Sequence, residues 1–261
     1  MAKDQIVHPV SWGESEIRGP VHIFRERLMM RLFRKFVMGG TVLDAGCGSG
    51  SFSFDLLRLG YQVEAVEKSA EFVKHLRQKI CSTRDVNRIK IQQASITQLP
   101  FPDKSFDGVV CGEVLEHVSD DVGGDKAAVI ELHRVTKPGS ACIVSVPLNP
   151  ELWDHSDEWA GHVKRYTYEA LFDLLEDHGF RVIEKRIWGF PLGRIYHRFL
   201  FAPWVRKTSA LEAKERTTRF DTRTANNRTL VNLVASVLRL DELFSHYPWG
   251  RGVVVAARRM D

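Results

Sequence analysis

The chain has 261 residues, of which 44% are hydrophobic and 27% charged, which is enough apolar content for one substantial core and argues against bulk disorder. Its net charge of +4 is well short of the Lys/Arg excess of a dedicated nucleic-acid binder, so we expect no DNA partner and disfavour an RNA partner. No apolar run approaches the ~20 residues of a membrane span, and the N-terminus lacks the apolar region of a signal peptide. The four cysteines form no CxxC pair, so we expect free thiols in a cytoplasmic protein.

The predicted elements begin with an amphipathic helix over residues 23–37, where apolar side chains recur every four positions and a Gly-Gly pair ends the helix. Strands and helices then alternate along the chain. Strands are expected at 41–46, 61–67, 88–94, 106–114, 141–147, 180–190 and 252–259, and helices at 52–59, 70–80, 126–135, 168–178 and 229–240. This alternation predicts the α/β class, with a doubly wound, mostly parallel sheet of seven strands.

The first expected strand leads into a glycine-rich turn, VLDAGCGSGSFS at 42–53. Such a turn at the carboxyl end of a strand lets the backbone approach a ligand closely. The spacing G-x-G-x-G differs from the dinucleotide fingerprint, whose third glycine position holds Ser51 here, and it lacks the lysine of a phosphate-binding P-loop. Asp44 before the turn suits a cationic ligand, and Glu67 at the end of the next strand can accept from two ribose hydroxyls. The pattern favours a positively charged nucleoside.

The motifs VLDAGCGSG, LPFPDKSFDGVVCGEVLEHV and ELHRVTKPGS, with Glu67 between the first two, resemble those of class I S-adenosylmethionine-dependent methyltransferases of the small-molecule type. The resemblance covers about residues 40–147 and implies an antiparallel last strand and S-adenosylmethionine as cofactor. The cofactor residues that it implies are Asp44, Ala45, Gly46, Cys47 and Gly48 at the methionine end, Glu67 and Lys68 at the ribose, Ser95 and Ile96 beside the adenine, and Cys111, Gly112 and Glu113 closing the site. Many relatives carry an Asp in place of Ser95, so this adenine contact is expected to be weaker or made by the main chain.

Two histidines are candidates for the base that deprotonates an acceptor. His117 follows the fourth strand, where the acceptor should lie, although a histidine bonded to backbone at a helix start would fit the same place. His162 is the alternative, in the segment WDHSDEWAGHVKRYTYEAL at 153–171. The aromatic and histidine content of this segment indicates an acceptor site or lid, or a loop that only packs on the domain. The substrate contacts expected in it are Trp159, Arg165 and Tyr166.

Glu113, Glu116 and His117 form the string E-x-x-E-H. Together with a later histidine, His162 or His155, this string is similar to the divalent-metal site of small-RNA 2′-O-methyltransferases and of certain quinone O-methyltransferases. Carboxylates and imidazoles of this kind bind divalent cations. Because the same string occurs in relatives not thought to bind metal, the sequence predicts a site without metal, with these residues as candidate ligands if one is used.

The rest of the chain departs from strict alternation. We expect an N-terminal helical segment at 1–40 and a methyltransferase domain at 41–261, with cap insertions near 148–167 and 190–250. The aromatic segment 188–204 fits a cap over an apolar acceptor pocket, an interfacial helix that touches a membrane, or a core-packed helix. The basic stretch 206–228 fits a solvated loop or a contact to a substrate phosphate.

We therefore expect methyl transfer from S-adenosylmethionine to a small-molecule acceptor, at an oxygen of a secondary metabolite, a quinone or a lipid-like compound. Two alternatives stay open from the sequence. An RNA methyltransferase would need a clustered basic face, and a non-catalytic scaffold subunit would bind the cofactor without turnover. The sequence specifies neither the acceptor nor the oligomeric state.

Overall fold

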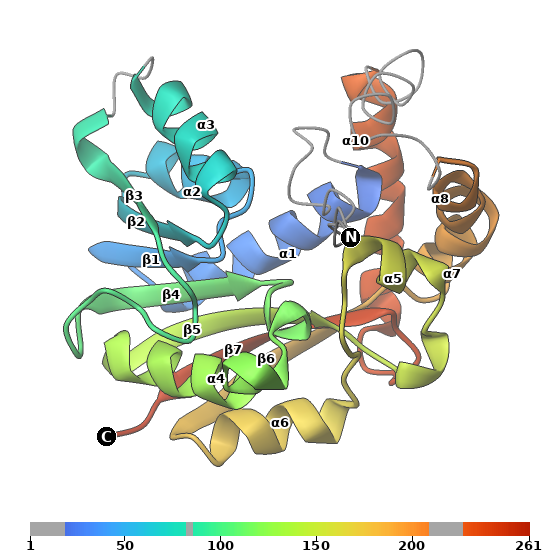
Figure 1. Cartoon of the computed structure of the whole chain (residues 1–261). Coiled ribbons are helices and arrows are strands. Elements are labelled where there is room, and N and C mark those ends of the chain that lie inside the picture. Colours follow the sequence, from blue (N-terminus) through green and yellow to red (C-terminus); the bar gives the residue numbers. More distant parts are fainter. Residues whose placement is uncertain (1–18, 82–85, 209–226) are drawn as a thin grey trace, which may run out of the picture.

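A seven-stranded sheet with helices on both faces forms the body of the protein, in a computed structural model that describes residues 19–81, 86–208 and 227–261 (Figure 1). The strands are β1 (Thr41–Ala45), β2 (Gln62–Glu67), β3 (Ile89–Gln93), β4 (Phe106–Gly112), β5 (Thr136–Pro147), β6 (Phe180–Trp188) and β7 (Gly252–Arg259). They lie in the order β3-β2-β1-β4-β5-β7-β6, with β7 antiparallel to both neighbours and the other pairs parallel. The predicted mostly parallel sheet with an antiparallel last strand is confirmed.

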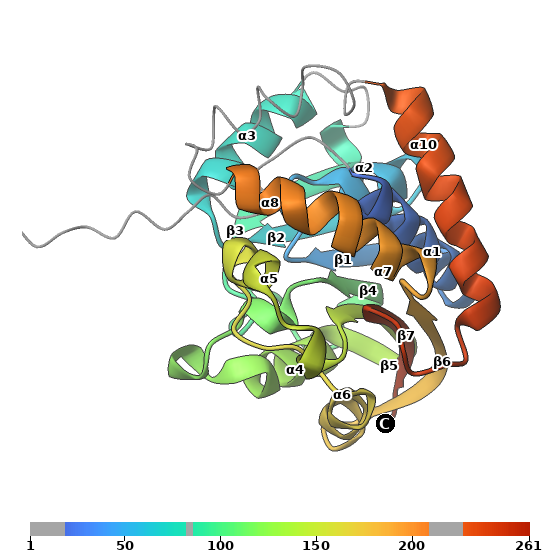
Figure 2. The ribbon, with the colours of Figure 1, turned by 90° about the vertical axis from the view of Figure 1, so that its right-hand side faces the viewer.

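Helices cover both faces of this sheet. The described helices are α1 (Pro20–Phe36), α2 (Ser51–Arg58), α3 (Ala70–Cys81), α4 (Gly124–Val135), α5 (His155–Ala160), α6 (Tyr168–Glu176), α7 (Leu192–Tyr196), α8 (Ala202–Thr208) and α10 (Arg228–Val237). Short 3-10 or π-helical turns are η2 (Val86–Arg88), η3 (Leu115–His117), η4 (Asp120–Val122), η5 (Pro150–Leu152), η6 (His197–Phe201) and η7 (Leu238–Phe244). Two apolar clusters result, one under α1, α2, α3 and α10 and the other under α4 and α6 (Figures 1 and 2).

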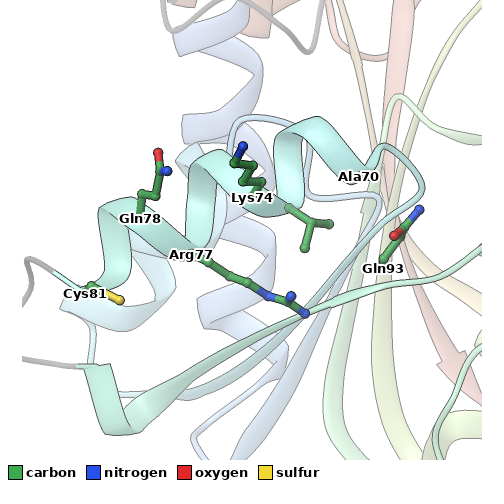
Figure 3. Close-up of a pocket in the computed structure, with 7 residues that line it drawn as sticks. Ala70, Lys74, Arg77, Gln78, Cys81 and Gln93 are labelled. Atoms are coloured by element: carbon green, nitrogen blue, oxygen red, sulfur yellow. The ribbon is translucent and has the colours of Figure 1, made fainter.

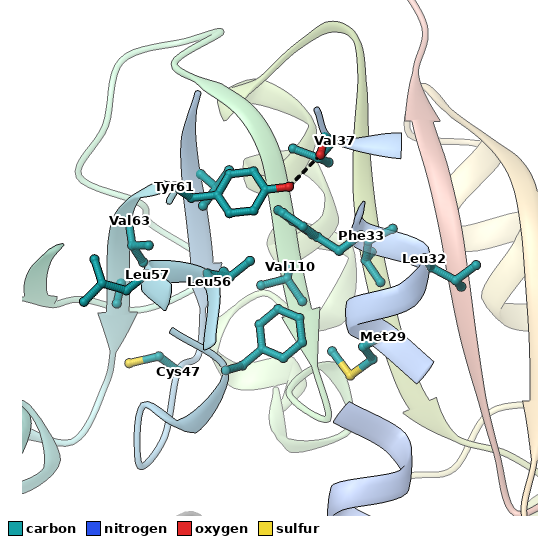
Figure 4. Packing of buried hydrophobic residues seen from close by; sticks show 14 of the residues in the cluster. Met29, Leu32, Phe33, Val37, Cys47, Leu56, Leu57, Tyr61, Val63 and Val110 are labelled. Atoms are coloured by element: carbon teal, nitrogen blue, oxygen red, sulfur yellow. Dashed lines mark hydrogen bonds between the residues drawn. The ribbon is translucent and has the colours of Figure 1, made fainter. Parts of the chain in front are cut away.

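Helix α1 is fixed by a fully buried phenylalanine. The ring of Phe33 meets the rings of Phe52 and Tyr61 edge-on, with centroids 6.3 and 5.5 Å apart. The hydroxyl of Tyr61 donates to the carbonyl of Val37 at 2.7 Å, just past the end of the helix (Figure 4). Because α1 also packs on β4, β5 and β7, its first half is held at the carboxyl ends of the strands.

Element boundaries differ from the predicted ones by a few residues. Helix α1 begins at Pro20, since a proline in the first turn needs no N–H partner. Strand β5 begins at Thr136 because Thr136 pairs with Phe106 before a bulge that contains the Lys-Pro-Gly turn signal. The expected 229–240 helix is α10 continued by η7, and most of the basic stretch 206–228 lies outside the described residues. Over the described ranges, no helix combines the length and apolarity that crossing a membrane requires.

Candidate active site

The glycine loop between β1 and α2 runs along the carboxyl edge of the sheet. Gly46 has a positive φ of 82°, and a Cβ there would lie 2.5 Å from a methyl carbon of Val114, so only glycine fits. The N–H groups of Gly46 and Cys47 both donate to the carbonyl of Val66, at 2.8 and 2.9 Å. The loop is therefore held against β2 as a fixed backbone surface.

Glu67 ends β2, and its carboxylate bonds to the glycine loop. One oxygen accepts from the N–H of Gly48 at 3.0 Å and the other from the N–H of Ser69 at 2.9 Å. The side chain is only partly buried, and each carboxylate oxygen retains acceptor capacity. This orientation is suited to the expected contact with ribose hydroxyls.

Three carboxylates surround the start of the glycine loop. Asp44 is 4% exposed, and one of its oxygens accepts from the hydroxyl of Ser53 at 2.5 Å. Burial raises the pKa of Asp44 to about 7; the Ser53 hydrogen bond opposes this rise, and the nearby charges of Glu26 and Glu67 add to it. Glu26 comes from α1, is itself buried and accepts from the hydroxyl of Ser51. Such a concentration of negative charge favours a cationic ligand.

No pattern in the sequence points to Glu26. It stands between Arg25 and Arg27 on the helix before the first strand, and this charged stretch is typical of a solvated face. Only the packing of α1 across the sheet edge brings the carboxylate to the loop.

The expected cofactor residues within the strands are mostly packing groups. Ala45 and Cys111 are fully buried at the ends of β1 and β4. Burial raises the pKa of the Cys111 thiol, and likewise that of Cys47, well above the ordinary value, so both stay neutral and inert. At Gly112 a Cβ would lie 2.4 Å from the terminal methyl of Met29. The absence of a side chain at this position therefore lets α1 approach the edge closely.

Residues expected near the ribose and adenine lie beside β3. Lys68 has an exposed side chain, and its carbonyl accepts from the side chain of Gln93 at 3.2 Å. Ile96 is buried, and the hydroxyls of Ser95 and Thr97 bond to each other at 2.8 Å. The hydroxyl of Ser95 is thus turned toward its own loop.

Glu113 adopts a positive φ of 56° directly after β4, and its carboxylate has partners on both sides. It lies 3.0 Å from the guanidinium of Arg25 and accepts from the hydroxyl of Ser145 at 2.6 Å. The guanidinium of Arg25 also lies 5.9 Å from the ring centroid of Trp188. This carboxylate is therefore engaged in holding α1 to the strand ends.

Glu116, His117 and His162 form a compact cluster at the end of β4, with ligand atoms all within 4.8 Å of one another. Glu116 is fully buried, and neither carboxylate oxygen has a hydrogen-bond partner. Burial and, next, the charge of Glu113 raise the pKa of Glu116 well above its ordinary value. Of the four metal-ligand candidates, the structure brings these three together and leaves Glu113 with Arg25.

Both imidazoles of the cluster are oriented through Nδ1. Nδ1 of His117 lies 3.0 Å from the carbonyl of Gly161, and Nδ1 of His162 lies 2.8 Å from a carboxylate oxygen of Asp157. Since both partners are acceptors, each Nδ1 carries a proton, and Nε2 is the acceptor atom of the neutral ring. The rings meet edge-on with centroids 4.9 Å apart. Burial and the neighbouring His162 lower the pKa of His117, against the effect of the Gly161 carbonyl.

Arg165 and Tyr166, the expected substrate contacts, both have hydrogen-bond partners inside the protein. Arg165 donates to Asp157 at 2.8 Å and to the carbonyl of Leu148 at 3.0 Å. The hydroxyl of Tyr166 donates to Asp125 at 2.7 Å, and the residue is 3% exposed. Both side chains hold the loop after β5 in place.

Trp159 instead connects two parts of the cap. Its ring centroid lies 6.4 Å from that of Phe201 and 5.9 Å from that of Trp204, which joins α5 to η6 and α8. His155 does the same through Nε2, 2.9 Å from the carbonyl of Ala202. This histidine therefore lies outside the Glu116 cluster.

Two hollows accompany this edge. A small cavity of about 50 Å³ lies under the cap, lined by α1, α7, η7, Trp188 and Arg251. A shallower one of about 320 Å³ runs along α3 (Figure 3). In Figure 3 the side chain of Arg77 extends toward the strands, and its guanidinium donates to the carbonyl of Ile91. Neither hollow includes a residue of the Glu116 cluster.

The model of the methyltransferase domain family matches residues 43–144. The chain is 26% identical over 187 residues to the O-methyltransferase resE of Aspergillus sclerotiorum, covering 68% of this chain and 69% of that relative. It is 32% identical over 136 residues to the ubiquinone biosynthesis O-methyltransferase of Xanthomonas oryzae, covering 51% of this chain and only 54% of that relative. The solved structure of the [4+2]-cyclase SpnF superposes with a TM-score of 0.64 at 21% identity, covering 97% of this chain and 87% of that one, which shows a shared fold.

Proposed function

Because this chain is a class I S-adenosylmethionine-dependent methyltransferase, we propose that it methylates an oxygen of a small-molecule acceptor held at the cluster of Glu116, His117 and His162. The single observation that carries the proposal is the buried Glu116 carboxylate, which lacks a hydrogen-bond partner and lies beside two imidazoles at the end of β4. Two relatives are named as O-methyltransferases, one of them of ubiquinone biosynthesis, and this supports a phenolic or quinol oxygen as the acceptor atom.

In this proposal the cofactor lies along the glycine loop. Its ribose hydroxyls bond to Glu67, and its cationic end lies near Asp44 and Glu26. The methyl group on a sulfonium is already reactive, so the protein must chiefly align the acceptor oxygen, the methyl carbon and the sulfur. The fixed loop backbone and the packed α1 provide a rigid frame for this alignment.

The acceptor hydroxyl must lose its proton as the new O–C bond forms and the C–S bond breaks. Asp157 holds Nδ1 of His162, and we assign Nε2, which lies 4.0 Å from Glu116, as the base at the cluster. Burial acts to raise the pKa of Asp157, but hydrogen bonds from His162 and Arg165 hold it below its ordinary value, so the carboxylate stays ionised. Arg165 thus positions the histidine indirectly.

The three side chains also fit a divalent cation. One carboxylate and two imidazoles with fixed Nδ1 partners are an established pattern for metal ligands. A cation held there would favour the anionic form of an acceptor hydroxyl. In this alternative Nε2 of His162 would be a ligand in place of a base, and the missing hydrogen-bond partner of Glu116 favours the cation.

The test is the variant Glu116→Gln, with Glu158→Gln on the exposed side of α5 as matched control. We expect Glu116→Gln to lower kcat by about 100-fold or more while the affinity for S-adenosylmethionine stays unchanged. Unchanged turnover would show that the acceptor lies elsewhere. If turnover survives exhaustive chelation but falls in Glu116→Gln and His162→Gln, the reaction uses the histidine base and no divalent cation.

A further inference from the structure

An apolar stripe runs along the outer face of α10 and into η7. Its side chains recur at spacings of three and four positions, which places them on one face of the helix. They are Leu230, Leu233, Val237, Leu240 and Leu243, with exposed fractions of 37, 60, 47, 55 and 74%. Figure 2 shows α10 at the edge of the molecule, on the far side of α1 from the strands.

The opposite face of α10 already anchors the helix to the fold. Val231, Ala235 and Leu238 are 8, 0 and 3% exposed. Arg27 of α1 donates to the side chain of Asn232 at 2.6 Å. The stripe is therefore not needed for packing, and a contiguous exposed row of large aliphatic side chains indicates a contact with something outside the chain.

Basic side chains border this stripe. Three exposed arginines lie at this border, Arg27 and Arg31 on α1 and Arg239 on η7. Arg31 and Arg239 share the single carboxylate of Glu242, at 2.6 and 3.6 Å, and Arg27 bonds to the amide of Asn232. Three positive charges against one negative charge give the border a positive excess. An apolar face with basic borders is the pattern of helices that lie in the interface of an anionic membrane.

Exposed aromatic side chains follow η7 along the chain. The rings of Tyr247 and Trp249 stack at 5.1 Å with an angle of 12°, and the residues are 48 and 50% exposed. Phe244 lies next to them, with its centroid 6.3 Å from that of Tyr247. Tyrosine and tryptophan have one apolar and one polar part, which suits the boundary between lipid and water.

We propose that the α10 stripe, with its basic border and the Tyr247–Trp249 pair, docks the protein on an anionic lipid surface. A second copy of the chain is a poorer occupant, because a two-fold contact through the stripe would bring the basic rows of two α1 helices together. The segment 209–226 is poorer as well, since its sequence offers only Leu211 and Phe220 as large apolar side chains. The docking concerns a different set of residues from the Glu116 cluster and stands independently of the acceptor.

The experiment is co-sedimentation of the full chain with vesicles of phosphatidylcholine alone and of phosphatidylcholine mixed with phosphatidylglycerol. We expect binding to the mixed vesicles, weakened by salt, and little binding to the neutral ones. The triple variant Leu233→Ser, Leu240→Ser, Leu243→Ser should reduce the bound fraction at least about tenfold. Ile130→Ser on α4, where the native residue is 46% exposed, is the matched control and should bind like the wild type.

Calorimetric binding of S-adenosylmethionine shows whether the triple variant is folded. Equal vesicle binding by the triple variant and the wild type would overturn the proposal, as would failure of the wild type to bind mixed vesicles. A wild-type dimer that the triple variant converts to a monomer would assign the stripe to a second copy of the chain instead.

Discussion

At the scale of single residues, Glu67 orders the carboxyl edge of the sheet, where we propose that the cofactor binds. Its carboxylate accepts from N–H groups of two separate loops. Replacing it by glutamine removes the charge that strengthens these bonds. We expect Glu67→Gln to bind S-adenosylmethionine at least about tenfold more weakly, a difference of about 1.4 kcal/mol that calorimetry measures directly. Glu71→Gln, an exposed residue at the start of α3, is the control. Equal affinity in wild type and Glu67→Gln would remove Glu67 from the site.

Asp44 predicts a pH dependence of cofactor binding. Its pKa is raised to about 7 without ligand, and a cationic ligand favours the ionised carboxylate, so binding releases a proton. Affinity should therefore rise with pH, by about tenfold between roughly pH 6 and 8. Asp44→Asn should bind more weakly and with a flatter pH profile. A wild-type affinity that stays constant over this range would contradict the assigned position of the cationic end.

At the scale of elements, α1 joins the core to both halves of the candidate site. Phe33 is 0% exposed and fixes the helix on Phe52 and Tyr61. We expect Phe33→Ala to lower the free energy of unfolding by about 3–5 kcal/mol in denaturant titration. Met38→Ala, where the native side chain is 91% exposed, should change it little. A loss below about 1 kcal/mol for Phe33→Ala would show that α1 is not anchored through this ring.

The elements themselves were predictable because their signals are local. Apolar alternation, the glycine loop and Glu67 depend on neighbours in the chain, and these predicted the sheet and the cofactor edge. Contacts between side chains of different elements leave no local pattern in the sequence. The contact of Glu26 on α1 with Ser51 at the glycine loop is an example. Arg165 has a side chain typical of substrate contacts, yet the fold turns it onto Asp157 to orient a histidine. A residue type alone does not tell which way its side chain faces.

At the scale of the whole molecule, the order of strands explains why the chemistry gathers where it does. Strands β1 and β4 are neighbours in the sheet although two strands separate them in sequence, so the glycine loop and the Glu116 cluster share one edge. The segments after β5 and β6 then close over this edge as α5, α7 and α8 (Figure 2). The α10 stripe faces away from the sheet (Figure 2).

The most direct test is methyl transfer by the purified full chain from isotopically labelled S-adenosylmethionine, with phenols, quinols and RNA offered in separate reactions. We expect the label on an oxygen of a small-molecule acceptor, and we expect it to disappear in Glu116→Gln although the cofactor still binds. Cofactor binding without transfer to any acceptor, or label that appears in RNA alone, would contradict the proposed function.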